Sequence, residues 1–359
     1  MGNSQTKLQM KNKIERLKNI FLTKLKINSR ERESVSSVSP TPMPQMVYLE
    51  LTNHCNLRCI MCTFHSPFSP FLINGKLPRE KGFMEKALAF GIVEELGSSG
   101  QPITLALHGA GEPLLYKDLP DVLAQASHYP NLNTGFLTNT TLLTPKIAEK
   151  LLENGLKWIS FSIDGNDPKL FSKYRKGSDF DKVFSNVMKF IEIARKKGST
   201  VTTHVNMTVQ EEMWQQVDGF VEFWLPLVDR VSISPCRPMG SRRSHLVSPE
   251  AKRIPCPMLF SMMVIYWDGN VGLCCEDWFN AGQMGNVKKE GVASIWQGKR
   301  FQWARNMHQR GLYSRVPLCG NCDIWFNGTP EVIRDNSKGY IITKNAWQWE
   351  YRKDAIQQS

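Results

Sequence analysis

The chain has 359 residues, of which 41% are hydrophobic and 22% charged, with a formal net charge of +12 and a mean hydropathy of −0.33. This is the composition of a globular protein long enough for one large domain and a smaller one. A membrane-spanning chain is excluded, because no run approaches the roughly 18 consecutive apolar residues that a span requires. We also expect no secretory signal peptide, because the start of the chain lacks an apolar core.

Residues 1–45 predict a basic helix followed by a linker. Apolar side chains recur at steps of three or four between residues 7 and 27, which is the spacing of one helix face. Nine basic and three acidic residues in 1–33 supply half of the net charge. We favour a helix that packs on the rest of the protein with its charged face in solvent; the alternative is peripheral contact with an anionic membrane or an acidic partner. The Ser/Pro-rich segment 34–45 predicts an extended linker.

From residue 46 to residue 235, β-rich runs alternate with helical stretches. The runs are 46–52, 103–108, 132–138, 157–163, 201–209 and 229–235, and helices are expected near 80–97, 117–128, 144–154, 179–197 and 210–225. Strands that alternate with helices form a parallel sheet through right-handed crossovers. We therefore predict an α/β fold, a partial (β/α)6 TIM-like barrel with its chemistry at the C-terminal ends of the strands.

The alternation stops after Pro235, and residues 236–330 predict a smaller second domain. Its sequence MVIYWDGNVGLCC predicts a hairpin that turns at Asp268-Gly269. Residues 331–359 form a C-terminal tail to which the sequence assigns no role.

The nine cysteines favour metal or cluster ligation over disulfides. They are Cys55, Cys59, Cys62, Cys236, Cys256, Cys274, Cys275, Cys319 and Cys322. An odd number with close local spacings, in a chain of this size without a secretory signal, is typical of a reducing compartment. We therefore expect a cytoplasmic protein.

Three of these cysteines directly follow the first expected strand, in the sequence Cys55-Asn-Leu-Arg-Cys59-Ile-Met-Cys62. Their thiolates can hold one face of an iron–sulfur cluster, and a 4Fe–4S cluster ordinarily takes four cysteines. Three local ligands therefore indicate one iron left open for a ligand that is not protein. The alternative is a zinc site completed by His54 or His65.

This motif after the first strand of a βα barrel resembles the radical S-adenosylmethionine (SAM) superfamily. The resemblance implies that the three cysteines hold a 4Fe–4S cluster whose open iron binds SAM. It also implies that one electron, from a flavodoxin- or ferredoxin-type donor, cleaves SAM to a 5′-deoxyadenosyl radical that abstracts hydrogen from substrate.

Further positions match the family in chain order. Gly109-Ala110-Gly111-Glu112-Pro113 resembles the GGEP motif that contacts the SAM amino group, with Ala110 in place of a glycine. The resemblance implies further SAM contacts from Ser162 and Asp164 at the end of the fourth strand. It implies others from Arg175, which pairs with the SAM carboxylate, and from Asn206.

The second domain resembles the SPASM/twitch extension of this superfamily, in its form with one auxiliary cluster. Four thiolates would complete a 4Fe–4S cluster, and the resemblance implies Cys256, Cys274, Cys319 and Cys322 as its ligands. Adjacent strand residues face opposite ways, which leaves the choice between Cys274 and Cys275 open; we prefer Cys274. The alternatives for this group are zinc and buried thiols.

Cys236 ends the sixth expected strand, where its thiol either donates a hydrogen atom to a substrate radical or is simply buried. Basic residues follow it: Arg237, Arg242, Arg243, Lys252 and Arg253. They predict either a site for an anionic group of the substrate or a solvated loop, and nucleic acid is not expected because aromatic residues are not interleaved with them. His108, at the end of the second strand, is either a base or, as we favour, structural.

Together these features predict a radical SAM oxidoreductase with a small-molecule substrate. We expect dehydrogenation or epimerisation of a sugar- or aminocyclitol-like alcohol, with Cys236 quenching the radical in the epimerase case. The rival hypotheses are modification of a peptide or protein side chain and a non-catalytic electron carrier with two clusters.

Overall fold

The computed structural model describes residues 40–237, 252–326, 331–335, 338–344 and 348–354. The expected N-terminal helix, the first half of the linker (residues 34–39), and Arg242 and Arg243 lie outside these ranges. None of the helices in the described ranges is long and apolar enough to cross a membrane.

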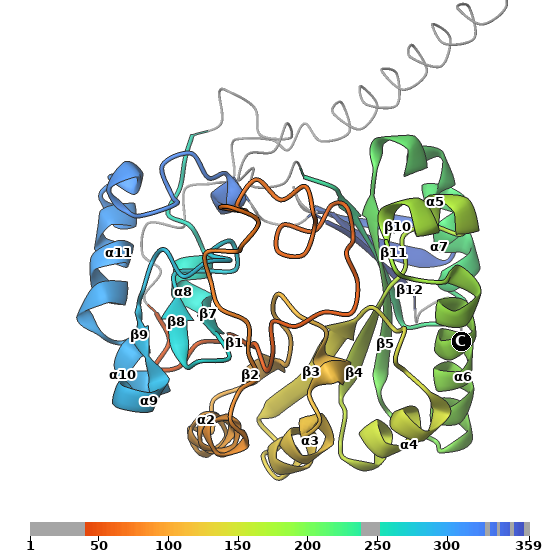
Figure 1. The fold of residues 1–359 in the computed structure, drawn as a ribbon, viewed down its shortest axis with the longest axis horizontal. Helices are drawn as coiled ribbons and strands as arrows, with labels where there is room; N and C mark the ends of the chain where they lie inside the picture. The colour runs from red at the N-terminus through yellow and green to blue at the C-terminus, as the bar shows by residue number, and fades with distance from the viewer. Residues whose placement is uncertain (1–39, 238–251, 327–330, 336–337, 345–347, 355–359) are drawn as a thin grey trace, which may run out of the picture.

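Six parallel strands form the centre of the structure, and each lies beside the next in sequence (Figure 1). They are β1 (Met46–Leu49), β2 (Ile103–Ala106), β3 (Leu132–Thr138), β4 (Trp158–Ser162), β5 (Thr202–Val209) and β6 (Arg230–Pro235). The helices lie outside this curved sheet: α2 (Lys86–Ser98), α3 (Leu119–Ser127), α4 (Pro145–Glu153), α5 (Pro168–Tyr174), α6 (Phe180–Lys196) and α7 (Val217–Trp224). The predicted partial (β/α)6 barrel is confirmed.

Side chains on each strand alternate between the helices and the barrel interior. In β5, the buried Val205 and Met207 belong to the hydrophobic core, whereas His204, Asn206 and Thr208 are only half-buried. Successive strand residues point to opposite faces of a sheet, so the second set faces inward. The core therefore lies between sheet and helices, and the interior is largely polar.

The first helix begins at Lys86, six residues later than the expected 80, because the residues before it are bonded to the segment after β1. Thr52 Oγ1 donates to the Gly82 carbonyl (2.8 Å), and Asn53 Nδ2 donates to the Glu80 carbonyl (2.8 Å). The segment before α2 thus lines the same end of the barrel as the cysteine loop.

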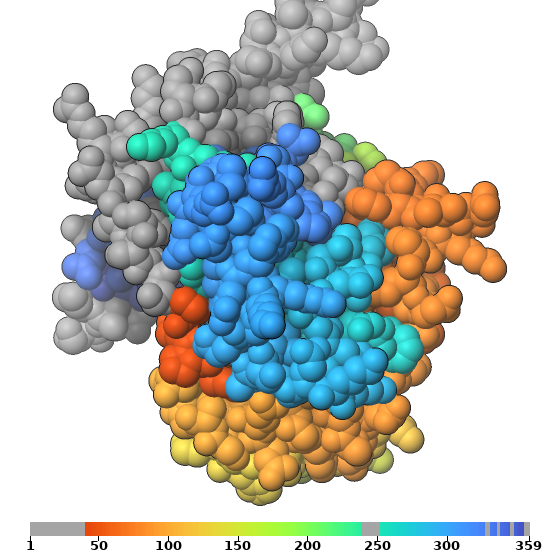
Figure 2. All heavy atoms as spheres, turned by 90° about the vertical axis from the view of Figure 1, so that its left-hand side faces the viewer, coloured from red at the N-terminus to blue at the C-terminus, as the bar shows by residue number. Residues whose placement is uncertain are grey.

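Residues 252–326 extend the sheet beyond β1. Their elements are α8 (Met258–Ser261), β7 (Met262–Ile265), β8 (Asn270–Gly272), β9 (Gly285–Asn286), α9 (Val287–Glu290), α10 (Val292–Trp296), α11 (Lys299–Gln309) and the short 3-10 helices η5 (Tyr313–Arg315) and η6 (Ile324–Phe326). The expected hairpin is present as β7 and β8, with Gly269 at φ +86° in its turn. Because β7 pairs in parallel with β1, this second region shares the barrel sheet. Its cyan and blue atoms occupy the centre of the face shown in Figure 2.

The C-terminal residues extend the other edge of the sheet. Three antiparallel strands, β10 (Glu331–Asp335), β11 (Tyr340–Lys344) and β12 (Trp349–Lys353), follow one another, and β12 pairs antiparallel with β6. The sheet therefore has twelve strands in the order β10-β11-β12-β6-β5-β4-β3-β2-β1-β7-β8-β9. The tail for which the sequence indicated no role thus covers the β6 edge.

Candidate active site and cluster sites

Cys55, Cys59 and Cys62 lie in the loop that follows β1. Backbone hydrogen bonds hold this loop against the end of α5, from Arg58 N–H to the Lys176 carbonyl and from Ile60 N–H to the Tyr174 carbonyl (both 2.9 Å). Burial is the main cause that raises the pKa of all three thiols. Charge on a second thiol of the triad also raises each pKa: Cys59 acts on Cys55, Cys62 on Cys59, and Cys55 on Cys62. The three sulfurs are therefore mutual neighbours.

The surroundings of this triad fit a bound cluster. Backbone N–H groups donate to sulfur, from Leu57 to Cys55 (3.4 Å) and from His65 to Cys62 (3.2 Å). The nearby Arg175 guanidinium favours the thiolate form of Cys59 and Cys62. A thiol that burial keeps neutral becomes a thiolate when a metal takes the place of its proton.

A single zinc ion fits the triad less well. Zn–S distances of about 2.3 Å require thiolates within roughly 4 Å of one another, and no three His, Cys, Asp or Glu side chains in the described ranges are grouped to hold one ion. The ring of His54 stacks on Phe83 with 4.6 Å between centroids. Burial, with Lys81 and Arg58 nearby, lowers the pKa of His65 to about 4, so its ring is neutral; zinc is therefore disfavoured by the separation of the thiols and not by His65.

The loop after β2 lies directly beside the cysteine loop. Glu112 N–H donates to the His54 carbonyl (2.8 Å), and a Cβ at Gly111 would collide with the carbonyl oxygens of Thr52 and His54. The buried Glu112 carboxylate accepts hydrogen bonds from Thr138 Oγ1 (2.7 Å), Asn139 N–H (2.7 Å) and Leu114 N–H (3.1 Å). A carboxylate has about four acceptor positions, so Glu112 retains capacity for one further donor such as an ammonium group.

Asp164 and Arg175 form a buried ion pair on the other side of the triad. Arg175 Nε donates to Asp164 Oδ2 (2.7 Å), and Thr208 N–H donates to Asp164 Oδ1 (2.8 Å). Burial acts to lower the pKa of Arg175, but the charge on Asp164, and after it the charges on Cys59 and Cys55, raise this pKa. The guanidinium thus lies between the carboxylate and the thiols.

Ser162 and Asn206 are register partners on β4 and β5 and face the barrel interior. Asn206 Oδ1 is buried, and no donor in the described part of the chain reaches it. A buried acceptor without a donor is costly in the free protein, so this atom fits a ligand that brings a donor.

Asn139, at the end of β3, was missed in the sequence. Its Nδ2 donates to Asn56 Oδ1 (2.9 Å) and approaches Cys55 Sγ (3.8 Å). Its position at the C-terminal end of a barrel strand is the signal that could have found it.

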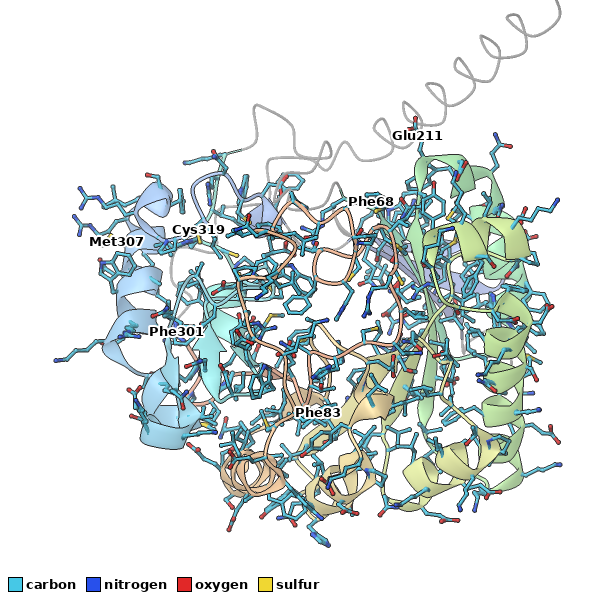
Figure 3. The ribbon with its side chains drawn as sticks, viewed as in Figure 1. Phe68, Phe83, Glu211, Phe301, Met307 and Cys319 are labelled. Atoms are coloured by element: carbon cyan, nitrogen blue, oxygen red, sulfur yellow. The ribbon has the colours of Figure 1, made fainter. Side chains whose placement is uncertain are left out.

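The second cysteine group also converges. Burial raises the pKa of Cys256 well above its usual value, and charges on Cys274, Cys322 and Cys319 raise it further. The four cysteines chosen from the sequence therefore lie together, with Cys319 on the side of the barrel that faces α11 (Figure 3). Burial likewise raises the pKa of Cys322 to about 11.

The expectation that Cys274 and Cys275 face opposite ways as strand residues is wrong. Strand β8 ends at Gly272, and the two side chains contact each other through a hydrogen bond instead of facing opposite ways. Their further neighbours nevertheless differ. Cys274 lies near Cys256 and Cys322, whereas charge on Cys275 raises the pKa of Tyr48, on β1, and of Arg237.

Two of the basic residues proposed for an anionic group have partners inside the protein. Arg253 donates to the carbonyls of Cys319 (2.5 Å) and Gly320 (3.0 Å), and its guanidinium lies 4.2 Å from the ring centroid of Tyr313. Arg237 pairs with Glu276 (2.6 Å). Both guanidiniums therefore hold the second cysteine group or the loop beside it.

Cys236 and His108 occupy different surroundings. Cys236 directly follows β6, and its N–H donates to the Val209 carbonyl (2.8 Å). Burial is the largest cause that raises the pKa of its thiol, and the charge of the nearby Asp164 carboxylate raises this pKa further. His108 Nδ1 accepts a hydrogen bond from Leu137 N–H (3.2 Å), and burial lowers the pKa of His108 to about 4. This environment supports the structural interpretation of His108.

A curved parallel sheet with a thiol triad after its first strand, and a second thiol group beside it, defines a class of iron–sulfur barrel proteins. Residues 49–223 match the family model described as the radical SAM superfamily, and residues 256–323 match SPASM, an iron–sulfur cluster-binding domain. The chain belongs to the radical SAM superfamily and carries a SPASM domain. Its cofactors are SAM, a SAM-binding 4Fe–4S cluster and an auxiliary cluster.

Similar proteins include two relatives with different described roles. The tungsten-containing aldehyde ferredoxin oxidoreductase cofactor-modifying protein of Pyrococcus furiosus is 24% identical, over 77% of this chain and 87% of its own length. The S-adenosyl-L-methionine-dependent 2-deoxy-scyllo-inosamine dehydrogenase of Niallia circulans is 24% identical, over 77% of this chain and 92% of its own length.

A solved structure supports the fold. Streptococcus suis SuiB, bound to its precursor peptide SuiA, matches with a TM-score of 0.58 and 15% identity, over 74% of this chain and 67% of SuiB.

Proposed function

We propose that this radical SAM enzyme dehydrogenates or epimerises a sugar- or aminocyclitol-like alcohol. The length match to the inosamine dehydrogenase supports this proposal, because 92% of that enzyme aligns with 77% of this chain. The polar barrel interior also supports it, since hydroxyl, amide and imidazole groups suit a polyhydroxy substrate.

Cys55, Cys59 and Cys62 would hold the first cluster, and Glu112 would accept a hydrogen bond from the SAM amino group. Arg175, oriented by Asp164, would pair with the SAM carboxylate, while Gly109, Ala110, Gly111, Ser162 and Asn206 would line the remainder of the site. When bound, the first cluster supplies the electron that cleaves SAM to the radical that removes a hydrogen atom from the substrate.

Cys256, Cys274, Cys319 and Cys322 would hold the auxiliary cluster. In a dehydrogenase, the substrate radical left after hydrogen-atom abstraction would lose one electron to this cluster and one proton to a base, which gives the carbonyl. In an epimerase, Cys236 would instead return a hydrogen atom to the substrate carbon from the opposite face. The thiyl radical left on Cys236 would then take one electron from the flavodoxin- or ferredoxin-type donor and one proton from solvent. The position of Cys236 at the barrel edge beside Asp164 is the observation that supports this second role.

The chain's environment and electron source follow from the same chemistry. Clusters held by thiolates suit a reducing, cytoplasmic setting, and a flavodoxin- or ferredoxin-type protein would supply the electron.

The test is anaerobic turnover of the reconstituted, reduced protein with SAM and candidate alcohols in deuterated buffer. Formation of 5′-deoxyadenosine with a new carbonyl supports dehydrogenation, and solvent deuterium at a carbon atom supports epimerisation. The variant Cys236→Ala should retain turnover in a dehydrogenase and stall in an epimerase. Absence of 5′-deoxyadenosine would contradict the proposal and favour an electron carrier, and cleavage dependent on a peptide would favour side-chain modification.

A further inference from the structure

We propose that the buried ion pair of Glu50 and Arg79 is a positioning device for SAM binding: it fixes the backbone of Ala110 beside the thiol triad. This inference rests on the proposed SAM site at residues 109–112. Neither residue belongs to a motif that the sequence singled out.

Glu50 is the first residue after β1, and its carboxylate has three donors. Arg79 Nη1 and Nη2 donate to its two oxygens at 2.7 and 2.9 Å, and Ala110 N–H donates to Oε2 at 2.9 Å. The side chains of Arg79 and Glu50 are only 8% and 2% exposed. Two parallel hydrogen bonds between a guanidinium and a carboxylate fix the orientation of both groups. Oε2 of Glu50 is therefore held in the position where it accepts the hydrogen bond from Ala110 N–H.

The loop has little freedom to move away from this carboxylate. A Cβ at Gly109 would lie 2.6 Å from Cβ and Cγ of Glu50, so the glycine backbone packs directly on that side chain. At the other end of the loop, Glu112 N–H is bonded to the His54 carbonyl. The loop is therefore bonded to the β1 extension at residues 110 and 112, on either side of the closely packed Gly111.

Arg79 also connects this loop to the second region. Its guanidinium lies 4.1 Å from the ring centroid of Tyr266, which follows β7, and 5.2 Å from that of Phe64. The Tyr266 hydroxyl donates to the Asp277 carbonyl, and Asp277 N–H donates to the Cys274 carbonyl (3.0 Å). A continuous series of contacts thus leads from Ala110 to the second cysteine group.

The variant Glu50→Gln tests the device, because it keeps the shape of the side chain but removes the charge that binds Arg79 and strengthens the bond to Ala110. We expect the SAM dissociation constant of the reconstituted protein, measured by equilibrium dialysis without reductant, to rise about tenfold. We expect iron content to stay at the wild-type level. Hydrogen exchange at the Ala110 amide, measured without SAM, should be faster than in the wild type.

Glu95→Gln is the matched control, because Glu95 also joins the barrel to the second region. Its carboxylate accepts hydrogen bonds from Val292 N–H (2.9 Å) and Ala293 N–H (2.8 Å). Neither of these donors belongs to the loop at residues 109–112. We expect wild-type SAM affinity and wild-type exchange at Ala110 in this variant.

If Glu50→Gln does not fold, Arg79→Lys is measured instead, since it keeps the charge and loses the paired geometry; it should also weaken SAM binding. Wild-type affinity and exchange in a folded, cluster-loaded Glu50 or Arg79 variant would overturn the inference, as would an equal loss in Glu95→Gln. Failure of the wild type itself to bind SAM would instead overturn the proposed function.

Discussion

Cys55, Cys59 and Cys62 lie within one loop of eight residues, whereas Cys256, Cys274, Cys319 and Cys322 come from three segments spread over 67 residues. The first group is held by backbone N–H donors close in sequence and by the end of α5. The cysteines of the second group come just before α8, just after β8 and after η5, so the group forms only when these three segments are packed together. A local group needs only its loop, and a dispersed group needs the whole region to fold first.

The two groups also differ in their charged neighbours. Glu112, Asp164 and Arg175 surround the triad at the C-terminal ends of the barrel strands. Around the second group, Arg253 bonds to the cysteine loop itself. The first group therefore has polar groups that suit a small ligand, whereas the loop of the second group is held by a guanidinium. Each prediction below separates the two groups.

The largest effect is expected for Cys59→Ala. Loss of one of only three ligands should abolish SAM cleavage, with at least a ~100-fold fall in 5′-deoxyadenosine formation, and iron should fall from about eight to about four per chain. Product chromatography and iron analysis measure both. Normal cleavage in this variant would show that the triad is not the SAM-binding group.

Cys322→Ala should affect the second group alone. Iron should again fall to about four per chain, but SAM cleavage should remain within about tenfold of the wild type while formation of the oxidised product stops. Comparison of 5′-deoxyadenosine with carbonyl product in one assay measures the separation. Equal loss of both products would show that the two groups do not act independently.

Arg175→Lys should weaken SAM binding about tenfold, because an ammonium cannot bond to Asp164 and to a ligand carboxylate with the geometry of a guanidinium. Arg230→Lys is the control: Arg230 pairs with Glu350 at 3.6 Å, half-exposed, at the start of β6. An exposed pair of this kind contributes roughly 0–1 kcal/mol, so SAM affinity should not change. Equilibrium dialysis compares the two variants.

Arg253→Met should loosen the second group without altering the first. Removal of the bonds to the Cys319 and Gly320 carbonyls should make loss of about four irons to a chelator several-fold faster. Arg300→Met removes a similar bond, to the Gln283 carbonyl (2.5 Å), from an exposed position on α11 and should have no effect. A stopped-flow chelation assay measures the rate of iron loss in both variants. An unchanged rate in Arg253→Met would contradict the role given to Arg253.

The smallest effect is expected for Cys275→Ser. Because charge on Cys274, and not charge on Cys275, is among the causes that raise the pKa of Cys256, this variant should retain about eight irons per chain, whereas Cys274→Ser should lose about four. Loss of iron from both variants, or from Cys275→Ser alone, would reverse the assignment of the fourth ligand.

The sequence by itself determined the barrel and the triad. The spacing of apolar residues along the chain predicts the alternation of strands and helices. The observed helices α3, α4 and α6 begin and end within one or two residues of the expected bounds. The triad could be recognised because its three ligands and their spacing are set by covalent connection within one loop.

Only the tertiary structure decided the pairing at the two sheet edges, the partners of Arg253 and Arg237, and the Glu50–Arg79 pair. Periodicity states which face of a strand is buried but not which strand lies beside it, so the contacts of β7 with β1 and of β12 with β6 could not be predicted. Buried charges likewise show their partners only when distant segments meet, because their cost depends on the groups that surround them in the folded chain.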